Sequence, residues 1–571
     1  MKCVTLLVFF CASALAAPAT ETKELDEWWK TAVFYQIYPR SYKDSNNDGS
    51  GDLEGITQKL TYLKDTGVQA AWLSPVFNSP MVDAGYDISD FRNINPIFGT
   101  MEDFDKLVEE ANRLGIKIIL DFVPNHSSNE HEWFKKSVKK EAPYTDYYVW
   151  SDGKVLEDGT RVPPNNWKSL FLGSAWEWND ERQQYYLHQF ATAQPDLNYR
   201  NPLVVEEMKN VLRFWLNKGV YGYRVDAIPF LFEDTRMLDE PKVDANMPDD
   251  EVQYPNLQHI YTMDQDETFD MIYQWRAVLD EFTTDGVSRA MMTEAYTSIE
   301  NQIRLYGNET HNGASFSFNF ILLSDVGKDS NARDFVNAIN KWLNALPPQY
   351  TSNWVVGNHD NHRTATKHGV GRVDGINMLV MILPGVGVTY NGEEIGMEDG
   401  YVSWEQTQDP NAINAGEENY LQYSRDPERT PFHWDDSINA GFNEGTEPWL
   451  PVSEKYKQTN LKAQQQADTS HYKIYQQIMK LRHSDVIKKG SYSITSTKDD
   501  NVIIVSRSYN GLKYVLVFNV GGTPVDANLE TLNKLTVKIS SVGSQYAVGT
   551  EINENNLKLN AYEALILETS V

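Results

Sequence analysis

The chain has little cysteine, and what it has lies at the extreme N-terminus. Of its 571 residues only Cys3 and Cys11 are cysteines. Both lie in a stretch where one lysine precedes an apolar run and small residues follow, which is the pattern of a secretory signal peptide. We expect cleavage near Ala16, so that residues 1–16 form the signal. The mature chain then has no disulfide, no thiol nucleophile and no cysteine-ligated metal, and its large core makes disulfides unnecessary.

Positive charge and long apolar segments are also scarce. The chain has 51 lysines and arginines against 80 aspartates and glutamates, a formal net charge of −29, which argues against nucleic acid and anionic membranes as partners. After the signal no run of about 20 apolar residues is long enough to cross a membrane, and the C-terminus lacks a lipid-anchor signal. We therefore expect a secreted, extracellular protein without a membrane anchor. The charge is compatible with a neutral small-molecule substrate, and the sequence leaves the oligomeric state open.

Three acidic residues each follow a short apolar segment that is typical of a buried strand. They are Asp226, Glu294 and Asp360. A carboxylate in such a position is costly unless it has a partner or a use. Strand-like runs alternate with helical patterns, such as the helix predicted over 101–114, which is typical of α/β folds. Acids at the ends of separate strands predict a (β/α)₈ barrel, where active sites lie at the carboxyl ends of the strands.

The spacing of the acids supports the barrel. A barrel of about 250 residues has about 31 residues per βα unit. Glu294 and Asp360 are 66 residues apart, which places them on the fifth and seventh strands. Asp121, assigned to the third strand, precedes Asp226 on the fourth by 105 residues. We therefore expect an extra segment between the third and fourth strands.

The predicted domain boundaries follow from this spacing and from a change of pattern near residue 485. Beyond it, apolar runs on both sides of Asn510-Gly511 predict a β-hairpin. The fold class is thus an α/β barrel with an inserted irregular domain and a C-terminal all-β domain. The boundaries are 26–126 and 201–487 for the barrel, 127–200 for the inserted domain and 488–571 for the β domain.

Carboxyl groups brought together in this way suit the cleavage of a glycosidic bond. Retention of configuration requires a carboxylate nucleophile and, about 5–5.5 Å away, a carboxylic acid that protonates the leaving oxygen and then activates water. A third carboxylate can bind sugar hydroxyls and raise the pKa of the acid. Each acid taken alone is better explained as an ion-paired core residue, but the three together favour a site.

Four ordered motifs resemble those of glycoside hydrolase family 13, the α-amylase family. They occupy residues 121–126, 222–227, 293–295 and 358–360. Residues 194–198 and 424–432 resemble the oligo-1,6-glucosidase and α-glucosidase branch of that family, and nearly the whole mature chain is similar to secreted insect maltases. The resemblance implies a TIM barrel and a retaining α-glucosidase that releases terminal α-1,4-linked glucose from maltose, sucrose and short oligosaccharides.

The resemblance also implies a role for each acid. Asp226 would be the nucleophile, Glu294 the general acid/base and Asp360 the transition-state stabiliser. Arg224, on the same strand face as Asp226, would orient that carboxylate and keep it ionised. Ala227 resembles the small residue of α-1,4-acting members, where members that prefer α-1,6 bonds tend to have valine.

A pocket for the non-reducing glucose is implied as well. In it Tyr86 would stack on the sugar, Asp83 would bind an outer hydroxyl, and Arg429 would pair with Asp83 to close the pocket. The other substrate-binding residues implied by the resemblance are His126, Gln194 and His359.

Residues 44–52 place oxygen-bearing side chains at alternate positions of a loop with glycines, which suits Ca²⁺. The loop is not a full EF-hand, because its twelfth position is Gly55 rather than glutamate. The resemblance implies a structural metal here, with Mg²⁺ as the alternative ion, and a polar turn without an ion explains the same residues. The implied ligands are Asp44, Asn46, Asp48, Asp52 and the carbonyl of Ser50. No organic cofactor is expected.

Two other functions and one modification complete the predictions. A transglucosylase or sucrose-acting enzyme would use the same covalent intermediate. A non-catalytic receptor or transporter partner is less well supported, because the acids are intact and no membrane helix is expected. Asn308 lies in a sequon for N-glycosylation.

Overall fold

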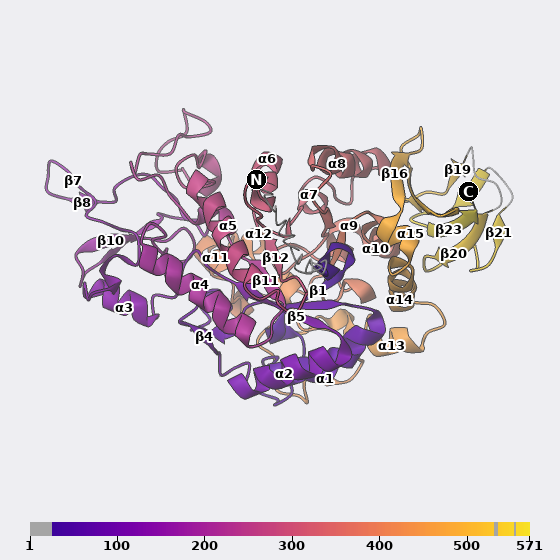
Figure 1. Cartoon of the computed structure of the whole chain (residues 1–571), viewed down its shortest axis with the longest axis horizontal. Helices are drawn as coiled ribbons and strands as arrows, with labels where there is room; N and C mark the ends of the chain where they lie inside the picture. The colour runs from indigo at the N-terminus through magenta and orange to yellow at the C-terminus, as the bar shows by residue number, and fades with distance from the viewer. Residues whose placement is uncertain (1–24, 530–534, 553–555, 571) are drawn as a thin grey trace, which may run out of the picture.

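Eight parallel strands form the centre of the molecule (Figure 1). The computed structural model describes residues 25–529, 535–552 and 556–570, so the predicted signal peptide and both cysteines lie outside the described residues. The strands pair in the order β13-β12-β11-β5-β2-β1-β15-β14. This is the sequential order of a (β/α)₈ barrel, which confirms the predicted fold class. The strands are β1 (Val33–Ile37), β2 (Ala70–Leu73), β5 (Lys117–Phe122), β11 (Gly222–Val225), β12 (Ala290–Thr293), β13 (Phe316–Ser317), β14 (Asn353–Trp354) and β15 (Val386–Tyr390).

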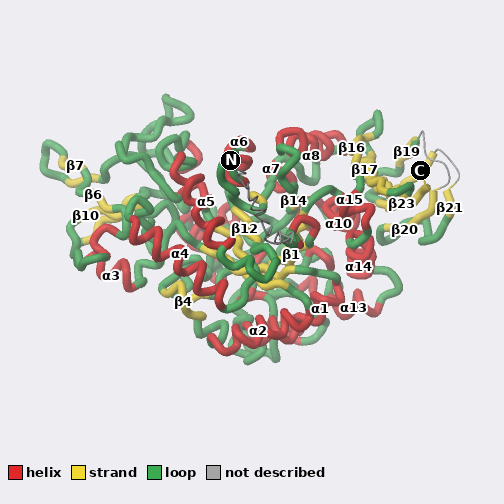
Figure 2. The backbone as a smooth tube through the Cα atoms, in the orientation of Figure 1, coloured by secondary structure: helices red, strands yellow, loops and turns green. Residues whose placement is uncertain are grey.

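Helices separate the strands along the chain and cover the barrel (Figure 2). One of them, α2 (Met101–Leu114), has the predicted bounds, with a capping box between Thr100 and Asp103 and a left-handed Gly115 at its end. The other helices that follow barrel strands are α1 (Leu53–Thr66), α4 (Pro202–Asn217), α5 (Asp266–Asp280), α6 (Ile299–Tyr306), α7 (Ile321–Ser324), α8 (Ala332–Ala345), α9 (Thr364–His368), α10 (Val373–Ile382) and α14 (His471–Arg482). No helix within the described ranges is long and apolar enough to span a membrane.

The side chains of the barrel strands alternate between two apolar clusters. Phe34, Trp72 and Ile119 belong to one cluster, whereas their neighbours Leu73 and Leu120 belong to the other. This is the period of two expected of a strand that is buried on both faces. Because the alternation fixes which side chains face the interior, it also decides which polar residues at the strand ends point into the site.

The barrel closes between β13 and β14 through a side chain. These two strands are not paired in the sheet order, but the fully buried Asn353 bridges them. Its amide nitrogen donates to the carbonyl of Ser317 (2.6 Å), and its amide oxygen accepts from the backbone nitrogen of Asn319 (2.9 Å). The bridge satisfies backbone groups that the missing strand pairing would leave unbonded.

A segment between β5 and β11 forms small structures of its own. It contains α3 (Glu132–Val138), the hairpin of β7 (Lys154–Val155) and β8 (Arg161–Val162), and the antiparallel sheet β6-β10-β9. In Figure 1 it extends to the left, on the side of the barrel opposite the C-terminal strands. The bounds of the sheet strands are β6 (Trp150–Ser151), β9 (Trp176–Asn179) and β10 (Gln184–Leu187), and a separate short pair comprises β3 (Phe77–Asn78) and β4 (Asp90–Ile94).

The chain beyond α15 (Asp485–Lys489) is antiparallel β structure. The predicted hairpin is present: β17 (Val502–Tyr509) and β18 (Leu512–Asn519) flank Asn510 and Gly511, whose φ angles of 48° and 79° are those of a type I′ turn. The other strands here are β16 (Ser491–Ser496), β19 (Val525–Asn528), β20 (Leu535–Ser540), β21 (Glu551–Ile552), β22 (Asn556–Leu559) and β23 (Ala564–Ser570), and the remaining helices are α11 (Pro410–Ala415), α12 (Tyr420–Tyr423) and α13 (Leu461–Gln466).

The bridge at Asn353 provides a test of barrel closure. We expect Asn353→Ala to lower the free energy of unfolding by about 1–3 kcal/mol, because it leaves buried backbone groups without partners. Chemical denaturation followed by tryptophan fluorescence measures this loss. Asn344→Ala, at an exposed position of α8, is the control and should cause no loss. Equal midpoints for Asn353→Ala and the wild type would show that the bridge does not contribute.

Candidate active site

The register of three neighbouring strands brings the predicted catalytic groups together. Arg224 on β11 lies opposite Asp121 on β5, and Val225 lies opposite Thr293 on β12. Asp226 and Glu294 each come one residue after that last pair, so they emerge at the same level of the barrel. Two predicted groups that are 68 residues apart in sequence thus become neighbours.

Arg224 is the centre of this group. Its Nη1 contacts Asp226 and lies 2.9 Å from Asp121 Oδ1, and its Nη2 lies 3.4 Å from Glu294 Oε2. The backbone nitrogen of Ala227 donates to the same Glu294 oxygen at 2.9 Å. Ala227 adopts a left-handed conformation with φ 52°, which is uncommon for a residue other than glycine and turns its N–H toward Glu294.

Two of the acids around Arg224 have raised pKa values. Burial raises the pKa of Asp226, and the charges of Glu294 and Asp121 raise it further against the opposing charge of Arg224. Burial likewise raises the pKa of Asp121 to about 6. Arg224 contacts Asp226 more closely than Glu294, so its charge stabilises the ionised form of Asp226 most directly. An ionised carboxylate is what a nucleophile requires.

Asp360 is held ionised on the opposite side of the site. It lies six residues beyond β14, and its Oδ1 contacts Arg429 Nη2 at 2.7 Å and Arg425 Nη1 at 3.3 Å. Although burial opposes the effect, His359, Arg429 and Arg425 lower the pKa of Asp360 below its ordinary value. Arg429 also donates to the carbonyl of His359 at 2.7 Å, which fixes the backbone beside Asp360.

The expected pairing of Arg429 with Asp83 is wrong. Arg425 takes that place: its Nη2 lies 2.9 Å from Asp83 Oδ1 and 2.7 Å from Asp409 Oδ1. The two arginines are four residues apart: Arg425 precedes the short helix at Pro427–Arg429, and Arg429 is its last residue. The turn of the chain between them directs Arg429 to Asp360, and Arg425 reaches both Asp360 and Asp83.

A chain of hydrogen bonds links Tyr86 to the acids. The Tyr86 hydroxyl lies 2.5 Å from His359 Nε2 and donates to Asp121 Oδ2 at 3.1 Å, and the two rings stack at 5.4 Å with an interplanar angle of 6°. Gln36 donates to the other ring nitrogen of His359 at 2.8 Å. The neutral His359 ring therefore carries its proton on Nε2 and donates it to Tyr86. Burial, the main cause, lowers the pKa of His359 well below its ordinary value.

The buried side chain of Asp87 positions the loop that carries Asp83 and Tyr86. Asp87 accepts hydrogen bonds from the backbone nitrogens of Asp83 and Val82. Burial raises the pKa of Asp87 to about 6. From the inserted segment, Gln194 donates to Asp83 Oδ2 at 3.0 Å and lies 3.1 Å from His126 Nε2. Residues predicted to form the sugar pocket thus interact directly.

A cavity of about 440 Å³ opens over the three acids, within the range of small-molecule sites. The inserted segment supplies one wall through Phe171 and Phe190, and Tyr254 and Tyr423 come from two later segments. The wall segments are joined, since Asn414 donates to the carbonyl of Phe171 at 2.9 Å. Asp83, Tyr86, His126, Asp226, Glu294 and Asp360 line the cavity, whereas Gln194, Arg224, His359 and Arg429 are absent from its lining and contact those residues.

Sequence reasoning did not assign a role to Arg425, Asp409 or the aromatic walls. Arg425 lies in the segment 424–432 that carried part of the family resemblance, so a signal was present. No sequence pattern marked Asp409, because its role depends on the fold. Its side chain caps α11 and also accepts a hydrogen bond from Arg425. The walls come from irregular segments with no periodic pattern.

The predicted metal loop is rich in internal hydrogen bonds. Asp44 accepts from the backbone nitrogens of Asn47 (2.6 Å) and Gly49 (2.8 Å), and Asp48 accepts from that of Ser50 (2.9 Å). Asp52 caps α1 through the Gly55 nitrogen at 2.6 Å and also binds Ser45. Oxygen atoms of the predicted set line the loop and suit a hard cation, although Asp52 already has a structural role.

The comparisons with known proteins agree with this geometry. Residues 36–490 match the family described as alpha amylase, catalytic domain. The chain is 50% identical to Maltase 1 of Drosophila virilis, with 95% of this chain and 88% of that protein covered. It is 49% identical to the salivary alpha-glucosidase of Aedes aegypti, with 92% of each covered. The crystal structure of the trehalulose synthase MutB from Pseudomonas mesoacidophila matches with a TM-score of 0.82 at 32% identity, covering 95% of this chain and 99% of that one.

The barrel, the acids at its strand ends and these similarities define a glycoside hydrolase. The chain belongs to glycoside hydrolase family 13, the α-amylase family. The predicted family and enzyme class are therefore confirmed.

A further buried acid supports the loop that carries Asp360. Glu393 accepts from Thr364 Oγ1 at 3.0 Å, and a Cβ added at Gly357 would lie 2.3 Å from its Oε1. Glycine at this position leaves room for the Glu393 carboxylate. Burial raises the pKa of Glu393 to about 8.

This pKa predicts how stability depends on pH. Because folding raises the pKa of Glu393, its contribution to stability is full below pH 4.5 and is lost as the pH rises through about 8. Glu393→Gln mimics the protonated acid and avoids the loss. Its melting temperature relative to the wild type should therefore increase between pH 5 and pH 8. The exposed Glu300→Gln on α6 is the control; melting curves of Glu393→Gln that shift in parallel with those of the wild type would contradict the prediction.

Proposed function

We propose that the protein is a secreted, exo-acting, retaining α-glucosidase that releases glucose from the non-reducing end of maltose, sucrose and short α-glucosides. The observation that carries this proposal is the pairing of Asp226 and Glu294 on one guanidinium. Both carboxyls contact Arg224, which is compatible with the separation of about 5–5.5 Å in a retaining pair. Asp360 faces them across the same cavity.

The proposed reaction has two steps. Asp226 attacks the anomeric carbon while Glu294 gives its proton to the leaving glycosidic oxygen, which forms a glucosyl ester on Asp226. Glu294, now a carboxylate, then takes a proton from the water that attacks the ester. The product glucose has the α configuration, and both acids return to their starting state. The ionised Asp360 would bind ring hydroxyls and stabilise positive charge at the sugar.

The far end of the cavity supports release of single terminal units. There Asp83 is held by Arg425 and Gln194, so its carboxylate is oriented to bind an outer hydroxyl of a terminal glucose. Ala227 beside the nucleophile supports α-1,4 over α-1,6 bonds. The relatives named maltase and salivary alpha-glucosidase support the substrate and secretion.

A transglucosylase remains the second candidate. The structural similarity to a trehalulose synthase supports it, since the same ester can pass glucose to a sugar instead of water. Product analysis at high sucrose distinguishes the two: free glucose and fructose indicate hydrolysis, and new disaccharides indicate transfer. A non-catalytic receptor is disfavoured by the complete set of acids.

We further propose that the loop of Asp44, Asn46, Asp48, Ser50 and Asp52 binds a structural Ca²⁺ and that Asn308 carries a glycan. The loop is held against Asn443, which donates to Asp44 at 3.0 Å, so an ion there would join two distant segments. Asn308 is exposed, as a glycan requires, whereas Asn125, in the sequon Asn125-His126-Ser127, is buried.

Removal of calcium tests the loop. A chelator should lower the melting temperature of the wild type, and added Ca²⁺ should restore it, because a ligand that binds the folded state stabilises it. Asp48→Ala should melt at a lower temperature and show no further change with chelator. If the chelator lowers wild type and Asp48→Ala equally, the loop is not the calcium site.

Two variants test the catalytic assignment. Asp226→Asn should abolish maltose hydrolysis. Glu294→Gln should slow it by about 10²- to 10⁴-fold, the usual contribution of a general acid. The same Glu294 variant should lose much less activity in the first, ester-forming step with a nitrophenyl glucoside, whose leaving group needs no proton. Initial rates, together with NMR of the first anomer formed from maltose, measure these outcomes.

The control is Glu300→Gln on the outer helix α6, which should keep wild-type rates. Unchanged turnover in Asp226→Asn, or β-glucose as the first product, would refute the mechanism.

A further inference from the structure

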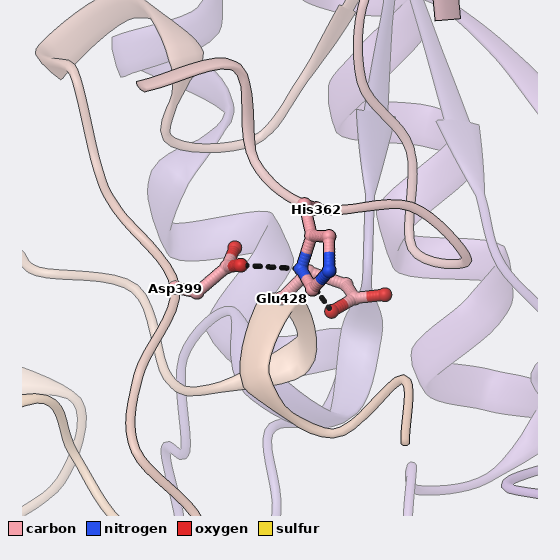
Figure 3. A group of neighbouring side chains, drawn as sticks. All are labelled: His362, Asp399 and Glu428. Carbon is pink, nitrogen blue, oxygen red and sulfur yellow. Dashed lines mark hydrogen bonds and ion pairs between the residues drawn. The ribbon is translucent and has the colours of Figure 1, made fainter. Parts of the chain in front are cut away.

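Three side chains that are absent from the cavity lining lie close together (Figure 3). His362 Nδ1 lies 2.7 Å from Asp399 Oδ2 and 3.9 Å from Glu428 Oε2. One ligand atom from each residue lies within 4.8 Å of the others, and among the described residues this is the group of acids and histidines with that geometry. The side chains come from two loops and the short helix at Pro427–Arg429, so the chain fold, rather than a local motif, assembles them.

Glu428 is the unusual member of the group. It is 2% exposed, and its Oε2 has no hydrogen-bond partner although it points toward the imidazole of His362 (Figure 3). The adjacent Arg429 directs its guanidinium to Asp360 and to the His359 carbonyl instead. A buried carboxylate oxygen without a partner is costly, so the fold retains an acceptor that nothing in the described chain satisfies.

The other two members differ in a way that suits a ligand site. Asp399 is held in place, because its Oδ1 accepts from the Arg363 backbone nitrogen at 2.8 Å and leaves Oδ2 directed at His362. His362 is 61% exposed, so an ion and its water can reach the group from solvent. Two carboxyl groups and one imidazole supply the oxygen and nitrogen atoms that bind a cation.

We propose that His362, Asp399 and Glu428 bind a divalent transition-metal ion, with Zn²⁺ as the best match. One imidazole nitrogen and two carboxylate oxygens are ligands that zinc prefers, and a water on the exposed side would complete a tetrahedral set. The nitrogen ligand disfavours Ca²⁺ and Mg²⁺, which take oxygen. The ion would join the loop of Asp360 to the short helix of Arg429.

Zinc titration of the full chain tests this site. Protein freed of metals and then saturated with Ca²⁺, to fill the loop of Asp44, is titrated with Zn²⁺ against a chromophoric chelator. We expect one equivalent to bind to the wild type. His362→Gln and Glu428→Gln should each weaken binding about tenfold or more, because loss of even an outer-shell partner costs 10- to 100-fold. The result does not depend on the proposed enzymatic activity, since it measures binding alone.

The matched control is His311→Gln, which removes an exposed histidine from a different loop and should bind Zn²⁺ like the wild type. Zn²⁺ should also raise the melting temperature of the wild type and of His311→Gln but not of His362→Gln. If Glu428→Gln does not fold, the surface variant His362→Gln decides the outcome. Wild-type affinity in His362→Gln, or no stoichiometric Zn²⁺ in the wild type, would overturn the proposal.

Discussion

The active site depends on one buried cation, the guanidinium of Arg224. It contacts Asp121 and Asp226 through one nitrogen and approaches Glu294 through the other. Without it, three carboxyl groups would lie in a barrel interior with no compensating charge, which is far too costly for all of them to ionise. Its planar fork suits several acids at once in a way that a lysine does not. The strand register then places the acids around it at fixed heights.

The walls of the pocket come from segments outside the eight βα units of the barrel. The inserted segment, the stretch around Tyr254 and the stretch from Trp404 to Arg429 all contribute walls. Arg425 joins them to the barrel, because it binds Asp83 and Asp409 and also lies over the ring of Phe171 at 4.9 Å. The walls that contact the substrate are therefore loops held in place by the barrel, as is usual for this fold.

The sequence predicted the parts of this site that depend on local patterns. Asp226 and Glu294 could be found because each follows a four-residue buried strand, and the spacing of the acids gave the strand numbers. Asp360 was placed on the seventh strand, but β14 has only two residues and ends six residues before it. The equally short β13 was not predicted as a strand, and closure between β13 and β14 relies on the side chain of Asn353. The sequence also could not show which arginine pairs with Asp83. Arg425 and Arg429 offer the same charge four residues apart, and only the path of the chain decides which one reaches an acid 342 residues away.

The number of arginines differs between the two sides of the active site, and the pKa values of the acids differ with it. Arg425 and Arg429 together serve Asp83, Asp360 and Asp409, and despite burial the pKa values of Asp360 and Asp409 are lowered. Arg224 alone serves the other three acids, and there burial raises the pKa of both Asp121 and Asp226. With three acids around a single guanidinium, burial favours a protonated carboxyl beside the nucleophile. A proton held there is available to the leaving oxygen, which a general acid must protonate.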